Sequence, residues 1–256
     1  PSTNNLYVLN LSLEQAGKVE DIAPGEQIYS VRFMGDRAYM VTFKKIDPFF
    51  VIGLEDPRNP KILGKLKIPG YSDYLHPYDD DHVIGFGKDA EEAKTGNFAW
   101  YQGIKMAMFD VSDVANPKQM HSVVIGDRGT DSPLLHNHKA LLFEKDRNLF
   151  AFPVTINKIS DEQKKTNDGS AYGSPVFQGA YVYDLTLKDG FKLRGTITHV
   201  DDPSIYQKSG DYWYSPASTI ERIVRAGTSL FTISQGGVRA HGEVDVKEQG
   251  KMMFSK

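Results

Sequence analysis

The stretch DRGTDSPLLHNHK, from Asp127 to Lys139, is the segment of the sequence richest in chemically active side chains. His136 and His138 are two residues apart, so on a β-strand their side chains would lie on the same side. Together with Asp131 they would supply the nitrogen and oxygen ligands of a metal ion. The same pair also fits a structural role, with both imidazoles hydrogen-bonded to loop backbone, and the sequence leaves both interpretations open.

A second cluster, HPYDDDH, places three consecutive carboxylates between His76 and His82. Clustered aspartate oxygens on a turn suit a hard cation such as calcium. Three adjacent carboxylates cannot all point inward, however, and the Asp-x-Asp-x-Asp-Gly spacing of a calcium loop does not occur, so a solvated hairpin turn is the ordinary interpretation. We therefore expect no cofactor, with a structural calcium ion at residues 79–81 as the alternative.

Two segments are rich in large aromatic side chains, which can stack on a sugar or on a peptide. The same side chains can instead cover the open end of a neighbouring sheet. We expect Trp100, Tyr101, Tyr212 and Trp213 to belong to a binding surface. The full set of these aromatic residues is Phe98, Trp100, Tyr101, Tyr206, Tyr212, Trp213 and Tyr214.

The composition excludes several classes of function. The chain has 256 residues, a formal net charge of -3 and a pI of about 6.2, so no charge of one sign attracts it to nucleic acid or to an acidic membrane. It has no cysteine, which excludes disulfides, thiol catalysis and iron–sulfur clusters. No apolar run approaches the length of a membrane-spanning helix, so we expect no membrane insertion.

The elements that position these residues follow from a repeat. GLEDPRNPKILGKLKIPG (53–70) and FDVSDVANPKQMHSVVIG (109–126) share an Asp-x-x-Asn-Pro-Lys core and a closing glycine. Each core reads as a turn between two strands, because Asp and Asn cap turns and Pro is excluded from central strands. Two apolar runs joined by a short polar turn, the pattern of a β-hairpin, recur four times. These hairpins are predicted at 29–43, 73–87, 139–153 and 220–234.

Each predicted hairpin is followed by a third and a fourth strand. The pairs are PFFVIGL and KILGKLKI, IKMAMFDV and KQMHSVVI, GAYVYDL and FKLRGTITHV, and GVRAHGEVDV and GKMMF. Repeated units of four antiparallel strands with almost no helical periodicity predict an all-β fold, a β-propeller. A β-sandwich is the main alternative for a strand-rich chain, but it predicts no four-strand period.

The repeat also predicts the domain organisation. We expect a single propeller domain over 1–256, with a half-blade at 4–27 and about four complete blades, and long loops at 88–103, 155–178 and 200–217. Because the half-blade lacks a partner, we expect the chain to be the C-terminal part of a larger propeller, with a strained five-bladed ring as the alternative. The complete blades are predicted at approximately 28–70, 71–129, 132–202 and 218–256.

Aligning the hairpins predicts which side chains share a level of the innermost strands. Tyr29, Asp73, Lys139 and Ile220 fall at one level, and Arg32 and His76 fall at another. In a propeller these strands line the central channel. The predicted channel-mouth binding site consists of Asp73, Arg128, His136, His138 and Glu221.

The segments SVRFMGDRAYMVTF, DPFFVIGLEDPRNPKILGKLKIPGYSDYLHP and IGDRGTDSPLLHNHKALLF resemble a bacterial and archaeal family. It is described as secreted proteins with a C-terminal β-propeller domain, distantly similar to WD-type repeats, and is functionally uncharacterised. The resemblance spans nearly the whole chain and implies a propeller, a longer parent chain and a secreted or cell-envelope location. The Gly-His and Trp-Asp signatures of true WD repeats are absent, so the partners of WD proteins are not carried over.

These observations favour a secreted or envelope-associated binding scaffold with a protein or glycan ligand. No nucleophile with its base is recognisable, so we do not expect an enzyme. The alternative is a propeller enzyme of the glycoside hydrolase or lyase type, with acid and base residues at the channel mouth. A purely structural domain is a third interpretation. Self-association, or pairing with missing propeller blades, is expected of an open ring.

Overall fold

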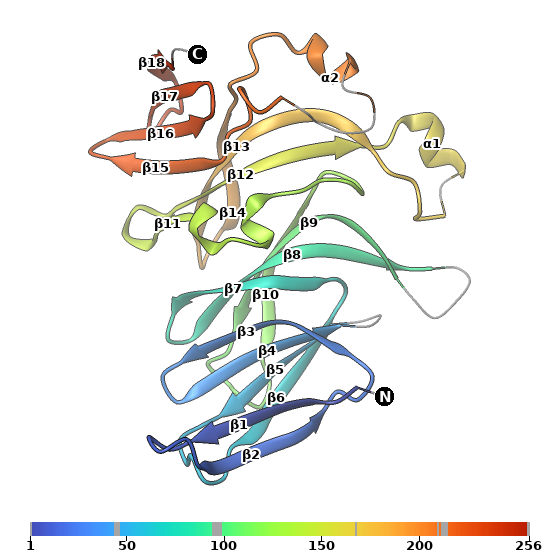
Figure 1. The fold of residues 1–256 in the computed structure, drawn as a ribbon, viewed down its shortest axis with the longest axis vertical. Helices are drawn as coiled ribbons and strands as arrows, with labels where there is room; N and C mark the ends of the chain where they lie inside the picture. The colour runs from blue at the N-terminus through green and yellow to red at the C-terminus, as the bar shows by residue number, and fades with distance from the viewer. Residues whose placement is uncertain are drawn as a thin grey trace. The chain divides into compact units, whose positions relative to one another are not determined.

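The computed structural model describes residues 2–43, 47–93, 99–166, 168–208, 210 and 215–254 (Figure 1). The chain divides into two compact units, the first made of Pro1–Tyr101 with Lys105–Ser122 and the second of Gln102–Ile104 with Val123–Lys256. Strands dominate both units, and four of the sheets are antiparallel with four strands each, which confirms the expected all-β architecture.

The first unit begins with a two-stranded sheet and continues with two four-stranded sheets, in which consecutive strands are neighbours. Residues 102–104 and 123–125 of the last of these sheets are assigned to the second unit. The two-stranded sheet contains β1 (Asn4–Leu9) and β2 (Gln15–Ile22). The next contains β3 (Gln27–Met34), β4 (Arg37–Phe43), β5 (Asp47–Gly53) and β6 (Lys61–Ile68). The third contains β7 (Tyr71–Asp79), β8 (His82–Glu92), β9 (Ala99–Asp110) and β10 (Lys118–Ile125).

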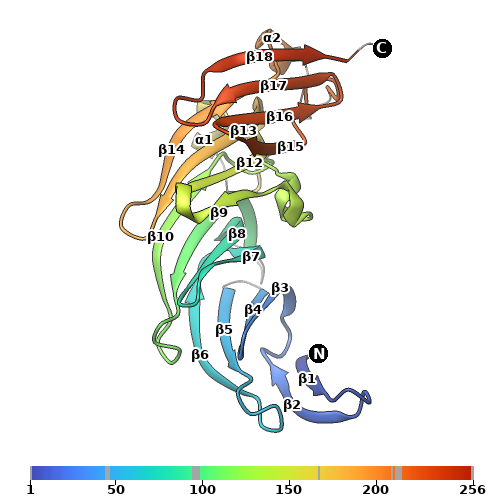
Figure 2. The ribbon, with the colours of Figure 1, turned by 90° about the vertical axis from the view of Figure 1, so that its left-hand side faces the viewer.

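The second unit contains two four-stranded sheets with the same consecutive strand order, which is easily followed for the last sheet in Figure 2. The first contains β11 (Leu142–Glu144), β12 (Leu149–Lys158), β13 (Ser174–Thr186) and β14 (Gly190–Ile197). The second contains β15 (Arg222–Ala226), β16 (Ser229–Ser234), β17 (Gly237–Gly242) and β18 (Glu248–Met253). The helices are α1 (Asp161–Thr166), α2 (Ser204–Lys208) and the 3₁₀ turns η1 (Pro133–Leu135), η2 (His138–Ala140) and η3 (Lys145–Arg147).

Neighbouring sheets of each unit pack face to face through apolar side chains. In the first unit Phe49 of β5 stacks on Tyr39 of β4 and on Phe109 of β9, with ring centroids 5.6 and 4.7 Å apart. All three rings are fully buried, so this aromatic row joins two sheets. In the second unit Val182 of β13 and Ile223 of β15 belong to one buried cluster and join the other two sheets in the same way.

The structure departs from the predicted strands around residue 139. Ser132 accepts a hydrogen bond from the Leu134 amide, and Asn137 accepts one from the Lys139 amide, so each caps a 3₁₀ turn. These caps satisfy the local backbone and oppose an extended conformation. The innermost strand therefore starts only at Leu142, and the prediction of a strand at Lys139 is wrong.

The predicted loops 155–178 and 200–217 also contain regular structure. The first holds the end of β12, α1 and the start of β13, and the second holds α2. In the first predicted loop, 88–103, β8 extends to Glu92 and β9 begins at Ala99. Among the described residues, no helix is both long and apolar enough to cross a membrane.

Candidate functional site

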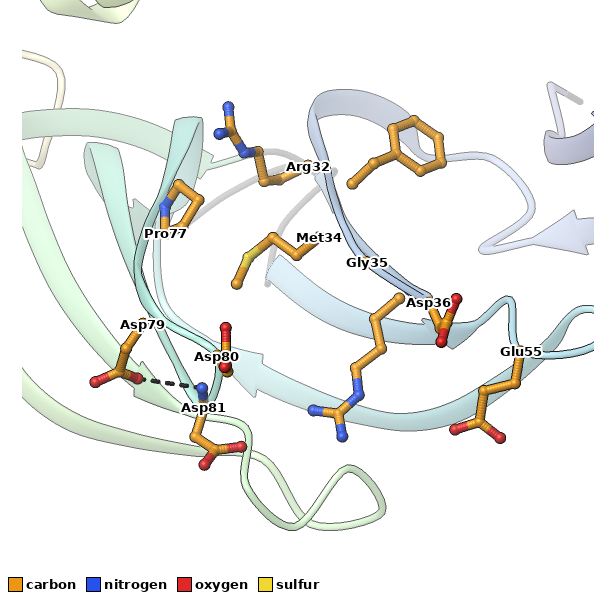
Figure 3. A pocket seen from close by; sticks show the side chains of 11 residues that line it. Arg32, Met34, Gly35, Asp36, Glu55, Pro77, Asp79, Asp80 and Asp81 are labelled. Carbon is orange, nitrogen blue, oxygen red and sulfur yellow. Dashed lines mark hydrogen bonds between the residues drawn. The ribbon is translucent and has the colours of Figure 1, made fainter.

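The candidate site is a cavity of about 580 Å³ in the first unit, between the β3–β4 turn and the β7–β8 turn (Figure 3). Both turns join the first two strands of their sheets. Its lining combines charged side chains with a few apolar ones. The lining residues are Arg32, Phe33, Met34, Gly35, Asp36, Arg37, Glu55, Pro77, Asp79, Asp80 and Asp81.

Local chain chemistry fixes both turns. Gly35 has a φ of 55°, which glycine adopts without strain, at the first position of a two-residue turn whose flanking pair is Met34 and Arg37. In the other turn, Asp79 Oδ1 accepts a hydrogen bond from the Asp81 amide at 3.1 Å. The same oxygen lies 2.6 Å from His82 Nδ1, so Asp79 is committed to holding the turn.

The remaining charges of the cavity are not neutralised by one another. In the described part of the chain, the carboxylates of Asp36, Glu55, Asp80 and Asp81 and the guanidinium groups of Arg32 and Arg37 form no ion pair. Five carboxylates and two guanidinium groups line the cavity in total, so its electrostatic potential is negative at neutral pH. Charges that the protein does not pair remain available to a ligand.

The Arg32 side of the cavity borders two polar side chains of β7. Tyr74 Oη lies 2.8 Å from His76 Nδ1. Burial, with a smaller contribution from the positive charge of Arg32, lowers the pKa of His76 to about 4, so this imidazole is neutral at pH 7. The charge of Arg32 thus acts on His76, the residue that the sequence places at the same level.

A second polar cluster surrounds His199 in the other unit. Its Nδ1 lies 2.9 Å from Ser234 Oγ, and its Nε2 lies 2.9 Å from Thr232 Oγ1. Ser234 Oγ donates its proton to the Ala217 carbonyl at 2.8 Å, so His199 Nδ1 must carry the hydrogen that Ser234 accepts. In this arrangement His199 cannot take the Ser234 proton, and the pair is structural rather than a nucleophile with its base.

Arg239 completes this cluster and fixes it between two sheets. One of its terminal nitrogens donates to the His199 carbonyl at 3.2 Å and to Asp201 Oδ1 at 2.8 Å. Burial, together with the nearby charge of Arg239, lowers the pKa of His199 to about 4. The cluster therefore consists of one charged arginine and one neutral histidine that join β17 to the segment that follows β14.

The predicted channel-mouth residues are distributed over both units. Asp73 lies on β7 in the first unit, whereas Arg128, His136, His138 and Glu221 belong to the second. Arg128 is only 5% exposed and lies over the Tyr172 ring, 4.4 Å from its centroid. Glu221 is exposed and accepts a hydrogen bond from Gln235 Nε2 at 3.1 Å.

The two histidines of the predicted metal site do not lie on a strand. His136 ends η1 and His138 begins η2, and both are exposed, so the premise that they face one side of a strand is wrong. Among the described residues, no group of three His, Asp or Glu side chains is placed to hold a metal ion, and this includes Asp131, His136 and His138 as well as the 79–81 turn.

The predicted aromatic surface is described only in part. Trp100 and Tyr101 are half-buried and belong to β9, so the prediction that they lie in a loop is wrong. Tyr206 of α2 accepts a hydrogen bond from the Gln178 amide at 2.9 Å and so packs on its own blade. Phe98, Tyr212, Trp213 and Tyr214 lie outside the described residues.

The cavity itself was missed by reasoning from the sequence, although both of its turns were predicted. From the sequence, the 79–81 turn is interpreted as a solvated turn with a structural calcium ion as the alternative, because each turn is considered alone. Aligning the two hairpins by residue position would have predicted the cavity. That alignment places the Gly35–Asp36 turn opposite the Asp80–Asp81 turn.

Comparisons with known proteins agree with this architecture. Residues 1–245 match the family model described as "Beta propeller domain". A solved europium-containing methanol dehydrogenase superposes with a TM-score of 0.55 at 10% identity, over 98% of this chain and 48% of that one. At this identity the likeness concerns the fold alone. The propeller predicted from the repeat is thereby confirmed.

Two archaeal proteins of uncharacterised function are similar in sequence. "Uncharacterized protein MJ1554" of Methanocaldococcus jannaschii is 37% identical over 199 residues, which cover 73% of this chain and 29% of that protein. An uncharacterised protein of Archaeoglobus fulgidus is 40% identical over 154 residues, covering 60% of this chain and 23% of that protein. The chain thus spans about a quarter of the length of these curated relatives.

Proposed function

The chain belongs to the beta propeller domain family. From this premise we propose that it is a binding scaffold, and that its first unit binds a basic side chain of a polypeptide ligand. Propellers present rigid strands and exposed turns, and binding residues are concentrated on such connecting segments. The cavity between the β3–β4 and β7–β8 turns is the proposed binding site.

The observation that carries this proposal is the set of carboxylates without ion-pair partners in the described part of the cavity. Asp80 and Asp81 are exposed at the tip of one turn, and Asp36 is exposed at the tip of the other. Phe33 beside them is 61% exposed, so its ring face is accessible to a cation. Lysine and arginine side chains match both features, whereas an uncharged glycan would leave these carboxylates unpaired.

A cavity of this size suits a ligand segment rather than a single ion. Ligand pockets typically measure about 300–1,000 Å³, and this one measures about 580 Å³. Met34 and Pro77 provide apolar contact area between the charged groups. A short stretch of polypeptide therefore fits the cavity better than a bare metal ion does.

We also propose that the protein acts in the cell envelope or outside the cell. The support is the resemblance of its repeat segments to secreted propeller proteins. The test is immunodetection in cell fractions of the source organism. Recovery from the envelope or medium is the expected result, and recovery from the cytosolic fraction alone would contradict it.

The binding proposal is tested with a fluorescein-labelled octapeptide of alternating glycine and lysine, followed by fluorescence anisotropy. We expect Asp80→Asn/Asp81→Asn to weaken binding about tenfold, because each exposed charge pair contributes up to about 1 kcal/mol. Added salt should weaken binding to the wild-type protein as well.

The control is Asp146→Asn, which removes one carboxylate charge, against two in the test variant, from the corresponding hairpin turn of the second unit, at η3. This variant should bind the lysine peptide as tightly as the wild type does. A loss of affinity in Asp146→Asn as well, in proportion to the one charge removed, would show that the peptide senses only overall charge, and would contradict the proposed site.

A further inference from the structure

A purely basic ligand leaves the two guanidinium groups of the cavity unexplained, and of these Arg37 donates to the Val111 carbonyl at 3.4 Å whereas the Nε of Arg32 is unsatisfied among the described residues. Arg32 lies on β3, lines the cavity, and is paired with no carboxylate in the described part of the chain. Its Nε is buried and has no hydrogen-bond partner among the described residues. Leaving this Nε unsatisfied costs free energy, and an anion at the terminal nitrogens of Arg32, which are not among the buried unpaired atoms, would offset that cost through its charge.

The surroundings of Arg32 favour an anion at this end of the cavity. Tyr74 and His76 of β7 lie close enough to feel the charge of Arg32, and both are uncharged at neutral pH. Burial raises the pKa of Tyr74 and lowers that of His76 to about 4. Uncharged polar groups neither neutralise Arg32 nor repel an incoming carboxylate.

The negative charges of the cavity lie elsewhere. Figure 3 shows Arg32 on one side of the pocket and Asp79, Asp80 and Asp81 on another, with Met34 between them. Asp36 and Glu55 lie on a third side. Arg32 and the carboxylates of the 79–81 turn thus place opposite charges on different sides of the cavity.

We propose that Arg32 binds a carboxylate of the ligand, so that the cavity recognises a polypeptide segment carrying an acidic group and a basic side chain a few residues apart. This inference rests on the proposed function and adds the second charge of the ligand. Arginine is suited to the role because its planar group donates two parallel hydrogen bonds to a carboxylate. The carboxylate comes from an acidic side chain or from the end of a chain.

The experiment uses three labelled peptides and fluorescence anisotropy with the whole chain. The first alternates Glu-Gly-Lys and is amidated at its C-terminus. The second replaces every Glu by Gln and is also amidated, and the third is the Gln peptide with a free C-terminal carboxylate. The proteins are the wild type, Arg32→Gln, Arg32→Lys and Asp80→Asn/Asp81→Asn, with folding checked by circular dichroism.

We expect Arg32→Gln to weaken binding of the Glu peptide about tenfold and to leave the amidated Gln peptide unchanged. Arg32→Lys keeps the charge and should recover part of the loss, which a folding defect would not allow. The matched control is Arg222→Gln. Arg222 lies on β15, which is the first strand of its sheet, as β3 is for Arg32, and this variant should bind the peptides like the wild type. If the wild type binds the Gln peptide with a free carboxylate more tightly than the amidated one, and Arg32→Gln abolishes that difference in affinity, the anion belongs to a chain terminus.

Two results would overturn the inference, namely that Arg32→Gln weakens neither peptide, or that it weakens the Glu peptide and the amidated Gln peptide equally. In either case the Asp80→Asn/Asp81→Asn protein decides the proposed function. If it loses affinity for both peptides, the cavity still binds a basic side chain, but Arg32 does not bind a carboxylate. If the wild type binds none of the peptides, both proposals fail.

Discussion

Phe49 illustrates how single side chains hold neighbouring blades together. Its ring is fully buried between those of Tyr39 and Phe109. We predict that Phe49→Ala lowers the free energy of unfolding by about 3–5 kcal/mol, because the cavity left behind adds to the lost burial. Urea unfolding measures this change.

The control for this prediction is Phe33→Ala, the same substitution at a ring that is 61% exposed. It should change the stability by no more than about 0.5 kcal/mol. Similar losses for the two variants would contradict the assignment of Phe49 to the core between the two sheets.

His199 makes the stability depend on pH. Its pKa is about 4 in the folded protein against an ordinary value of 6.5, so between these pH values the unfolded chain binds a proton that the folded chain does not. Stability is therefore lost as the pH falls through this window, by about 3 kcal/mol for the full shift. His199→Asn should flatten the pH dependence measured by urea unfolding from pH 7 to pH 4.5. An unchanged slope would contradict this role.

At the scale of elements, two glycines explain why the Asp-x-x-Asn-Pro-Lys turn occurs twice in the sequence, because each copy packs against one of them. Gly17 of β2 packs against Pro57 and Pro60 of one turn, and Gly64 of β6 packs against Val114 and Ala115 of the next. A Cβ on either glycine would collide with the backbone of the turn. Each turn therefore seats in a notch on the outer strand of the preceding sheet.

We predict that Gly64→Ala destabilises the protein by about 1–3 kcal/mol, since the turn at Val114 must move. Gly250→Ala is the matched control, because Gly250 also lies on an outer strand, β18, and nothing stands within 4 Å of its added Cβ. That change should be neutral. Thermal unfolding compares the two, and equal melting temperatures would contradict the notch.

The periodic elements could be predicted from the sequence, whereas those set by local capping could not. The strands at 61–68 and 118–125 have the predicted bounds, because alternation and the flanking Pro and Gly mark both ends. The sequence predicts that residues 127–139 lead into the innermost strand of a hairpin, yet the caps of Ser132 and Asn137 set 3₁₀ turns at 133–135 and 138–140. The site forms where turns from two different blades lie next to each other. The sequence of one repeat alone does not show which turns these are.

At the scale of the whole molecule, the two-stranded sheet leaves an edge of β1 without a neighbouring strand in the described part of the chain. The adjoining turn exposes apolar side chains, with Leu11 at 106% and Leu13 at 78% exposure. Open edges and exposed apolar groups promote association. We predict that the chain self-associates as its concentration rises, as measured by light scattering.

A charged pair at the turn should weaken that association. Leu11→Lys/Leu13→Lys is expected to lower the average mass toward that of the monomer. Leu193→Lys, at a residue that is 52% exposed on β14, should leave the mass unchanged. A concentration-independent monomer mass for the wild type would contradict the prediction.

The central claim, that the cavity of the first unit binds polypeptide, is tested most directly by mapping amide resonances with ¹H–¹⁵N NMR during titration with the Glu-Gly-Lys peptide. The predicted result is that shifts concentrate at Met34–Arg37 and at Asp79–His82, the two turns that border the cavity. Shifts confined to other segments, such as α2, would contradict it.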